Sequence, residues 1–306
     1  MKILVIGGGG QLGAKIIANG QKEHIIYATY MTRIPPLDAS RVYHVDKTDD
    51  GSMKKLVAKI KPNAVIDTAA LHNVDYCENN KEEAHRVNTV GTRIIAKACK
   101  TNGAKMVFIS TDYVFDGRKG LYMESDRATP INYYGRSKLE GEHAIVEECE
   151  NHAIARTSMI YSFVSTKSSQ SSSGKPLNFA MWVTQKLGRG EPLNIVNDQY
   201  SSPTLADSLA EALVKICEKD VRGLYHVAGK TRLNRYDFTL KLAEKMGYDV
   251  SLINPVGSAS LKQVAERPMN SSLNVDNIEK TLDDKMLSIN QALTIFRSQV
   301  NEAVTI

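Results

Sequence analysis

The sequence has few cysteines, few aromatic residues and no long apolar run. Its 306 residues include four widely spaced cysteines, Cys77, Cys99, Cys149 and Cys217, without a C-x-x-C pair. This spacing is not typical of a zinc site or a disulfide framework, so we expect free thiols in a reducing compartment. No apolar segment approaches the ~20 residues that cross a bilayer, and the run after Met1-Lys2 is too short for a signal peptide. We therefore expect a cytoplasmic protein that does not bind membranes.

The charge pattern also lacks the clustering expected of a nucleic-acid-binding protein. The net charge is +5, but lysines and arginines are spread along the chain. The seven histidines show no metal-ligand spacing, so no metal site is predicted. Hydrophobic residues make up 42% and charged residues 24%, as in ordinary globular proteins with a sizeable core. This composition suits an enzyme that handles phosphorylated ligands.

Apolar runs alternate with helical patterns through the first half of the chain. Strands are expected at residues 3–6, 25–30, 42–45, 64–67 and 105–109, and helices at 14–19, 53–61 and 81–101. Strands that alternate with helices indicate parallel strands joined by crossover helices. The sequence therefore predicts an α/β fold with a doubly wound, Rossmann-like parallel sheet.

A glycine-rich stretch follows the first expected strand. Gly7, Gly10 and Gly13 form G-x-x-G-x-x-G immediately before a helical pattern. Glycines let the backbone approach a pyrophosphate, and the helix N-terminus offers free N–H groups and a positive dipole end. The sequence context favours a dinucleotide site that includes Gln11 and Leu12, although four consecutive glycines would also suit a flexible loop.

The ends of later strands supply further candidate cofactor contacts. The second strand is followed by Arg33 and no carboxylate, which favours a 2′-phosphate and hence NADP over NAD; otherwise Arg33 is a surface arginine. Asp46, after the third strand, would contact the adenine end of the cofactor or cap the next helix. Ala69 and Ala70 follow the fourth strand, where ligands bind in open α/β sheets.

The stretch 132–142 predicts a helix with two reactive side chains on one face. Asn132 is its candidate N-cap, and Tyr134 and Lys138 lie four residues apart. A nearby ammonium lowers the pKa of a phenol, which is ordinarily about 10, so the pair can exchange a proton beside a carbonyl–alcohol interconversion. Ordinary amphipathic helices share this spacing. Thr111, after the fifth strand, would hydrogen-bond the carbonyl or begin a turn.

Together these motifs resemble the extended short-chain dehydrogenase/reductase superfamily and, within it, the dTDP-4-dehydrorhamnose reductase family. The resemblance covers nearly the whole chain. The matching stretches are Gly7–Gly13, Ser110–Gly117, Tyr134–Glu142, Arg156–Ser158, Asp198–Gln199 with Pro203–Thr204, Gly223–His226, and Arg267–Pro268 with Asn270, Ser271 and Leu273. An ordered set of seven is far more specific than any one glycine loop.

The resemblance implies reduction of the C4 keto group of a nucleotide-linked deoxysugar, dTDP-4-dehydrorhamnose, to dTDP-L-rhamnose. It implies that Tyr134 gives a proton to the C4 oxygen as hydride arrives from NADPH, which is preferred over NADH. Lys138 would hold the nicotinamide ribose and keep the pKa of Tyr134 low, and Thr111 would orient the carbonyl. Asn88 would support Lys138 through a water molecule.

The resemblance also implies the substrate contacts Thr111, Asp112, Tyr113, Met159 and Arg267. Arg267 would face the nucleotide diphosphate, or else pair at the surface. Met159 stands where the family usually has a tryptophan, and it offers no comparable flat surface for stacking. The serine-rich stretch 162–174 is longer than in the family, and we expect a flexible loop that closes as a lid.

By the same resemblance, residues 1–160 would form the dinucleotide-binding domain and 161–306 mainly a smaller C-terminal substrate-binding lobe, with about 190–230 returning to the Rossmann sheet. His226, inside a strand, is expected in the core. The expected ligand is a sugar nucleotide. The oligomeric state stays open, and a homodimer is one of the alternatives. Some family members use Mg2+ at a subunit interface, but no ligand set is recognisable.

Two other interpretations stay open. The regulatory β subunit of methionine adenosyltransferase is similar along its length and binds NADP, but it acts as a partner protein. A nucleotide-sugar epimerase or dehydratase would use the same scaffold. Met159 and the serine-rich stretch leave room for the regulatory role, whereas the intact Thr111, Tyr134 and Lys138 favour the reductase.

Overall fold

The structure is a computed structural model of the chain that describes residues 1–163 and 178–304. A seven-stranded parallel sheet forms its centre, in the order β11-β6-β5-β4-β1-β2-β3. These strands are β1 (Lys2–Ile6), β2 (Ile25–Tyr30), β3 (Val42–His44), β4 (Ala64–Asp67), β5 (Lys105–Thr111), β6 (His152–Thr157) and β11 (Gly223–His226). The chain order reverses between β1 and β4, and such a switch point opens a ligand crevice at the strand ends. The predicted Rossmann-like fold is confirmed.

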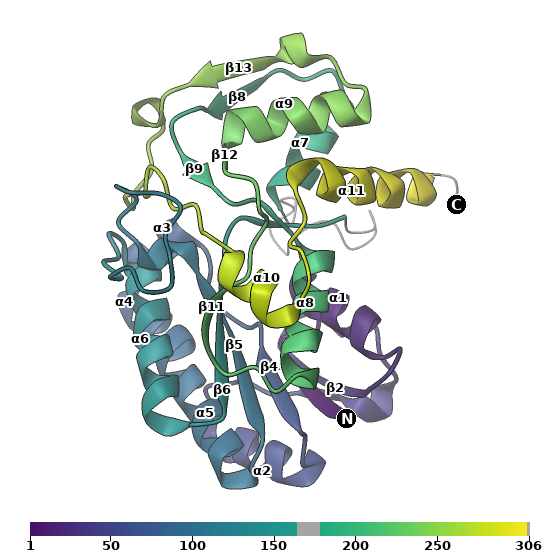
Figure 1. Cartoon of the computed structure of the whole chain (residues 1–306), viewed down its shortest axis with the longest axis vertical. Coiled ribbons are helices and arrows are strands. Elements are labelled where there is room, and N and C mark those ends of the chain that lie inside the picture. The colour runs from purple at the N-terminus through teal and green to yellow at the C-terminus, as the bar shows by residue number, and fades with distance from the viewer. Residues whose placement is uncertain (164–177, 305–306) are drawn as a thin grey trace.

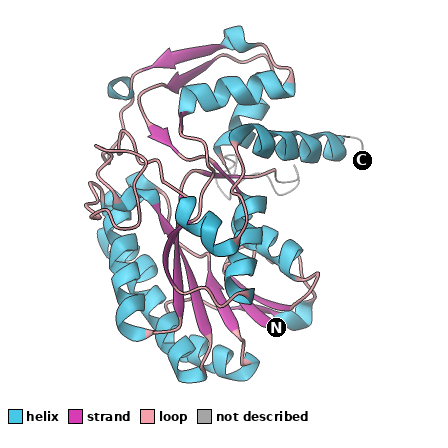
Figure 2. Cartoon of the chain, in the orientation of Figure 1, coloured by secondary structure: helices cyan, strands magenta, loops and turns pink. Residues whose placement is uncertain are grey.

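Helices cover both faces of this sheet (Figures 1 and 2). Along β1, Ile3 and Val5 pack on one face, while Leu4 and Ile6 pack on the other, because both faces of a parallel sheet are buried. The first face is covered by α1 (Gln11–Gly20), α8 (Ala206–Glu218) and α10 (Asp276–Leu282). The second is covered by α2 (Asp50–Ile60), α5 (Gly91–Asn102) and α6 (Tyr133–Glu148).

The single helix expected at residues 81–101 is interrupted. It begins as α4 (Lys81–His85), widens into a π-helical turn over Arg86–Val90 and continues as α5. A short helix that the sequence did not indicate, α3 (Val74–Asn79), precedes it. π-helical turns inside α-helices are often found at functional sites, and this one carries Asn88.

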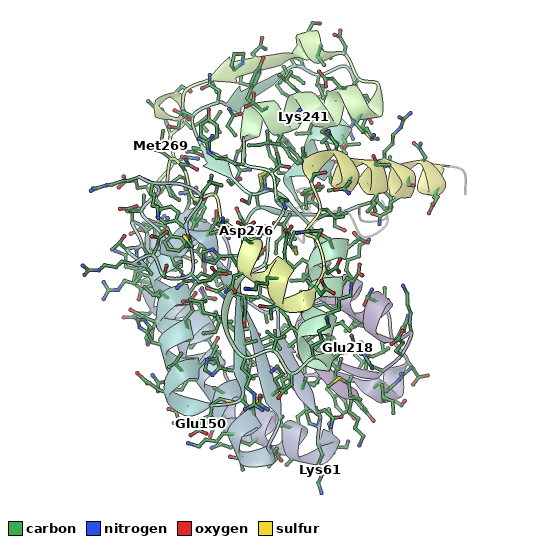
Figure 3. All side chains as sticks on the ribbon, viewed as in Figure 1. Lys61, Glu150, Glu218, Lys241, Met269 and Asp276 are labelled. Carbon is green, nitrogen blue, oxygen red and sulfur yellow. The ribbon has the colours of Figure 1, made fainter. Side chains whose placement is uncertain are left out.

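A smaller lobe lies beyond the carboxyl ends of the strands. Lys61 and Glu150, which precede β4 and β6, lie at the far end of the molecule from Lys241 in the lobe (Figure 3). Helices α7 (Phe179–Leu187), α9 (Arg235–Met246) and α11 (Ile289–Val304) share a third apolar core in this lobe. Its two-stranded sheets pair β7 (Ile160–Tyr161) with β10 (Thr204–Leu205), β9 (Tyr200–Ser201) with β12 (Leu233–Asn234), and β8 (Leu193–Val196) with β13 (Ile253–Val256).

The stretch 190–230 is divided between the two parts of the molecule. β11 pairs with β6 in the main sheet, whereas β8 pairs with β13 in the lobe. The expected return of this whole stretch to the Rossmann sheet is therefore wrong for β8, whose partner comes from more than fifty residues downstream. The expected lid at 162–174 lies, after Phe163, outside the described residues. His226 is buried in the core, as expected.

A buried ion pair joins the end of β4 to the loop after β3. Lys47 and Asp67 are only 4% and 1% exposed, and Lys47 Nζ lies 2.5 Å from Asp67 Oδ2. The same ammonium donates to the Ala69 carbonyl at 3.0 Å and to Thr92 Oγ1 at 3.2 Å. Because Thr92 belongs to α5, this cluster fixes the cofactor-side edge of the sheet against a covering helix.

Lys47→Met should lower the free energy of unfolding by about 3–5 kcal/mol, because it leaves Asp67 buried without a cation. Urea unfolding measures this loss. The double variant Lys47→Met/Asp67→Leu should recover most of it. Lys54→Met, which removes a pair with Asp50 that is 53% and 50% exposed, should change stability by less than about 1 kcal/mol. Equal losses from Lys47→Met and Lys54→Met would contradict the structural role of the buried pair.

Candidate functional site

The glycine loop between β1 and α1 requires glycine at specific positions. Gly7 has a φ of +82°, in the left-handed region, and a Cβ at Gly13 would lie 2.4 Å from the Gly7 carbonyl oxygen. α1 begins at Gln11 after an extended Gly10 that provides no side-chain cap. The N–H groups at this helix end are therefore left for a ligand, and the helix dipole favours an anion. The loop fits a dinucleotide pyrophosphate.

Gly8 and Gly9, which the sequence pattern did not single out, bring a second strand close to this loop. A Cβ at Gly9 would lie 1.9 Å from the Arg33 carbonyl oxygen, and one at Gly8 would lie 2.7 Å from Ala28 Cβ. Only the unbroken run of four glycines signals this double requirement. The close packing places Arg33 beside the glycine loop.

The remaining predicted cofactor contacts lie along the same edge of the sheet. A Cβ at Gly7 would lie 3.1 Å from Ala69 Cβ, so Ala69, with Ala70 next to it in the chain, borders the glycine loop. Asp46 Oδ1 accepts hydrogen bonds from the Thr48 N–H at 2.8 Å and from its hydroxyl at 2.9 Å. The alternative role of Asp46 as the next helix cap is wrong, because Asp49 caps α2.

The structure brings Thr111 and Tyr134 together at the carboxyl end of β5. Asn132 caps α6, with its Oδ1 accepting from the Gly135 N–H at 2.9 Å. The Tyr134 phenol lies close enough to the Thr111 hydroxyl for that hydroxyl to act on its pKa, and the Tyr134 ring centroid lies 6.0 Å from that of Tyr113 in an edge-on arrangement. This edge also carries the glycine loop at the end of β1.

Burial raises the pKa of Tyr134 well above its ordinary value, although the Thr111 hydroxyl partly offsets the rise. The expected lowering by Lys138 is therefore wrong in this structure. Lys138 is itself buried, and burial together with the charge of Lys47 lowers its pKa to about 7. An ammonium that is half neutral near pH 7 exerts a weak field, so Tyr134 keeps its proton and suits the role of a proton donor.

Lys138→Met should alter how stability depends on pH. The lysine pKa is near 10.5 when unfolded and about 7 when folded, so the unfolded state binds more protons between these values. Wild-type stability should therefore rise relative to the variant by about 2 kcal/mol from pH 7 to pH 9. Urea unfolding at both pH values measures this change. Lys55→Met, at an exposed lysine, is the matched control, and a pH-independent difference for Lys138→Met would contradict the shift.

Asn88 fastens the loop after β4 to α6. Its side chain accepts from the Leu71 N–H at 2.9 Å and donates to the Leu71 carbonyl at 3.0 Å. Its amide nitrogen also lies 3.0 Å from Ser137 Oγ, next to Lys138 in the sequence. The π-helical turn carries Asn88 to this position, and its predicted link to Lys138 through water stays a prediction.

The predicted substrate contacts Asp112, Met159 and Arg267 differ in their burial, backbone conformation and pairing. Asp112 is buried and accepts hydrogen bonds from Ser158 and Ser271, and burial raises its pKa to about 6. Met159 has a φ of +38°, which is strained for a residue other than glycine. Arg267 Nη1 lies 2.7 Å from Asp75 Oδ1, but only 11% of the Arg267 side chain is exposed, so this pair is not the surface pair of the alternative interpretation. Its contact with a diphosphate stays a prediction.

Arg235, at the start of α9, is a further candidate that sequence reasoning missed. Burial raises the pKa of Tyr113, and the charges of Arg235 and Arg267 partly offset this rise, so both guanidinium groups lie near its phenol. Arg235 also lies over the ring of Phe179, 5.0 Å from its centroid. Among the described residues, no carboxylate forms an ion pair with Arg235. Arg235 therefore places positive charge near Tyr113, whereas the charge of Arg267 is paired with Asp75.

The described residues contain no group of three histidine, cysteine or acidic side chains that could hold a metal ion. All four cysteines are free and buried. No helix in the described ranges is long and apolar enough to span a membrane.

Gly13→Ala should weaken NADPH binding by roughly tenfold or more, or about 1.4 kcal/mol, because its Cβ would force the Gly7 carbonyl away from the cradle. Gly51→Ala in α2 is the matched control, since its Cβ would meet only Asp49 Oδ1 at 3.6 Å. Fluorescence titration with NADPH measures both affinities. Unchanged affinity in Gly13→Ala would show that this loop does not hold the cofactor.

Comparisons with known proteins agree with this geometry. The chain matches the family described as "RmlD substrate binding domain" over residues 1–301. It is 31% identical to the probable low-salt glycan biosynthesis reductase Agl14 of Haloferax volcanii, over 97% of this chain and 100% of that protein. It is 32% identical to the dTDP-4-dehydrorhamnose reductase of Salmonella typhimurium, over 80% of this chain and 82% of that protein. A crystal structure of the Bacillus anthracis dTDP-4-dehydrorhamnose reductase in complex with NADP has a TM-score of 0.86 at 28% identity, over 97% and 99% of the two chains.

Proposed function

This chain belongs to the RmlD substrate binding domain family, and we propose that it is an NADPH-dependent reductase that converts dTDP-4-dehydrorhamnose to dTDP-L-rhamnose. The observation that carries the proposal is the contact between Thr111 and a protonated Tyr134, at the sheet edge that also bears the glycine loop. A phenol beside a hydroxyl can donate to a carbonyl oxygen while that carbonyl is reduced.

In the proposed reaction, bound NADPH supplies the hydride that reaches C4 of the sugar. Thr111 orients the C4 carbonyl by donating a hydrogen bond to its oxygen. Tyr134 transfers its proton to that oxygen, so the ketone becomes a secondary alcohol. Lys138, with a pKa of about 7, is able to hold or release a proton near neutral pH and would support the return of a proton to Tyr134.

Several features support NADP as the cofactor. The glycine loop admits a pyrophosphate only because Gly13 lacks a Cβ, and the uncapped start of α1 points its N–H groups to the same place. Arg33 lies beside this loop, where its charge would bind a 2′-phosphate. Asp46, Ala69 and Ala70 would line the rest of the cofactor path.

The lobe supplies the proposed sugar-nucleotide contacts. Arg267 and Arg235 approach Tyr113 from two separate segments, and a diphosphate would be attracted to both. Met159, beside Ser158, would contact the sugar without offering an aromatic face. We propose that residues 1–160 mainly bind the cofactor and 161–306 mainly bind the substrate. We propose that the enzyme is cytoplasmic and that it works as a homodimer.

The comparisons do not favour the alternative functions considered from the sequence, because the relatives above are named as reductases. An epimerase or dehydratase would yield a product that still carries a 4-keto group or an inverted hydroxyl. If the chain were a regulatory subunit, a pull-down with it would recover a methionine adenosyltransferase, and the purified chain would not consume NADPH.

The proposal predicts that purified protein oxidises NADPH faster than NADH when given dTDP-4-dehydro-6-deoxy-L-mannose, within a panel of sugar nucleotides. Tyr134→Phe should lower the rate by about 10²-fold or more and leave cofactor affinity nearly unchanged, because only the proton donor is lost. Tyr133→Phe, at the neighbouring half-buried tyrosine, should keep the activity.

Absorbance at 340 nm follows the oxidation, and fluorescence titration gives the affinity. No turnover of any sugar nucleotide by cofactor-bound wild-type protein would reject the proposed function. Full activity in Tyr134→Phe would instead remove Tyr134 from the mechanism.

A further inference from the structure

The buried carboxyl group of Asp112 lies between the catalytic hydroxyl and the substrate side of the molecule. Asp112 is only 3% exposed to solvent. Oδ2 accepts hydrogen bonds from Ser271 Oγ at 2.5 Å and from Ser158 Oγ at 2.7 Å, while Oδ1 accepts a longer one from Thr111 Oγ1 at 3.2 Å. One carboxylate therefore joins the end of β5, the segment after β6 and the C-terminal loop before α10.

The hydrogen bonds continue from these serines into the lobe. Ser158 Oγ accepts from the Ser202 N–H at 3.3 Å, and Ser202 Oγ accepts from the Leu273 N–H at 3.1 Å. The Ser271 N–H donates to the Tyr200 carbonyl at 3.0 Å. The segment 200–202 is therefore hydrogen-bonded to both serines. A substitution of Asp112 would displace this segment together with the segments that carry Ser158 and Ser271.

Two of these segments carry proposed substrate contacts. Ser158 directly precedes Met159, whose left-handed backbone is held by the surrounding hydrogen bonds, including one from the Thr204 N–H to the Met159 carbonyl at 3.2 Å. Ser271 lies four residues after Arg267 in the same loop. The positions of Met159 and Arg267 relative to Thr111 therefore depend on the bonds that Asp112 accepts.

We propose that Asp112 is a positioning residue for the sugar nucleotide: its carboxylate holds Ser158 and Ser271 against Thr111 and so sets the width of the substrate site. This inference rests on the proposed function. Both oxygens of the carboxylate are already engaged by hydroxyl donors, and hydrogen bonds to a charged acceptor are the stronger kind.

The lengths of the three bonds fit this division of roles. Thr111 has a single hydroxyl proton, and its bond to Asp112 is the longest of the three. That proton can turn to a substrate carbonyl while the two shorter serine bonds remain in place. Asp112 thus keeps the site assembled while Thr111 changes its partner.

The test compares Asp112→Asn and Ser271→Ala with Ser272→Ala. Ser272 is the matched control because it is also buried and hydrogen-bonded, to the side-chain amide of Asn270 at 2.8 Å, but has no hydrogen bond to Asp112 among the described residues. Steady-state kinetics give kcat and the KM for the sugar nucleotide and for NADPH. We expect Asp112→Asn and Ser271→Ala each to raise the sugar-nucleotide KM by roughly tenfold, with the KM for NADPH unchanged.

Ser272→Ala should leave both KM values unchanged, even where all three variants lower the melting temperature. Because Asp112 and Ser271 act through one bond, the double variant should be little worse than the more affected single variant. An unchanged sugar-nucleotide KM in Ser271→Ala, or an equal rise for NADPH or in Ser272→Ala, would overturn the proposal. Ser271→Ala keeps the carboxylate, so it decides the question even where Asp112→Asn does not fold.

Calorimetric binding of dTDP to the NADP-bound protein separates this proposal from the proposed function. A loss of dTDP affinity in Ser271→Ala but not in Ser272→Ala supports the positioning role, whether or not wild-type protein turns over a sugar. Equal affinities in wild type and Ser271→Ala would count against the positioning role alone.

Discussion

The close packing of α6 against the end of β5 is the constraint on which the site depends. A Cβ at Gly135 would lie 2.0 Å from the Tyr113 carbonyl oxygen, so the helix can approach this far only with glycine there. Asn132 fixes where the helix begins, and the first turn then carries Tyr134 onto Thr111. Because Thr111 ends a central strand, the same packing sets the proton donor on the sheet edge that also carries the glycine loop, with β4 between the two strands.

Burial governs the electrostatics of this edge more than pairing does. Desolvation raises the pKa of Tyr134 and of Asp112, and it lowers the pKa of Lys138. Lys47 and Asp67 remain tightly paired in the same region, and the charge of Lys47 adds to the shift of Lys138. The edge therefore holds a protonated phenol and an amine whose pKa is lowered to about 7.

The substrate side is assembled from segments that are distant in the sequence. Asp112, Ser158 and Ser271 meet around one carboxylate, and Arg235 and Arg267 meet near Tyr113. The family match accounts for the scaffold and the reducing chemistry.

The sequence by itself determined the parallel α/β fold, the glycine loop and the placement of Tyr134 and Lys138 on one helix face, because these follow from local periodicity, strand–helix alternation and a helical spacing of four. Only the resemblance implied that Thr111 joins them. The sequence did not determine the direction of the Tyr134 pKa shift, the π-helical turn at Asn88 or the partner of β8. It also did not indicate which backbone Gly9 packs against or which serines surround Asp112. Only the tertiary structure decided these, since desolvation and contacts between distant segments exist only once the chain is folded.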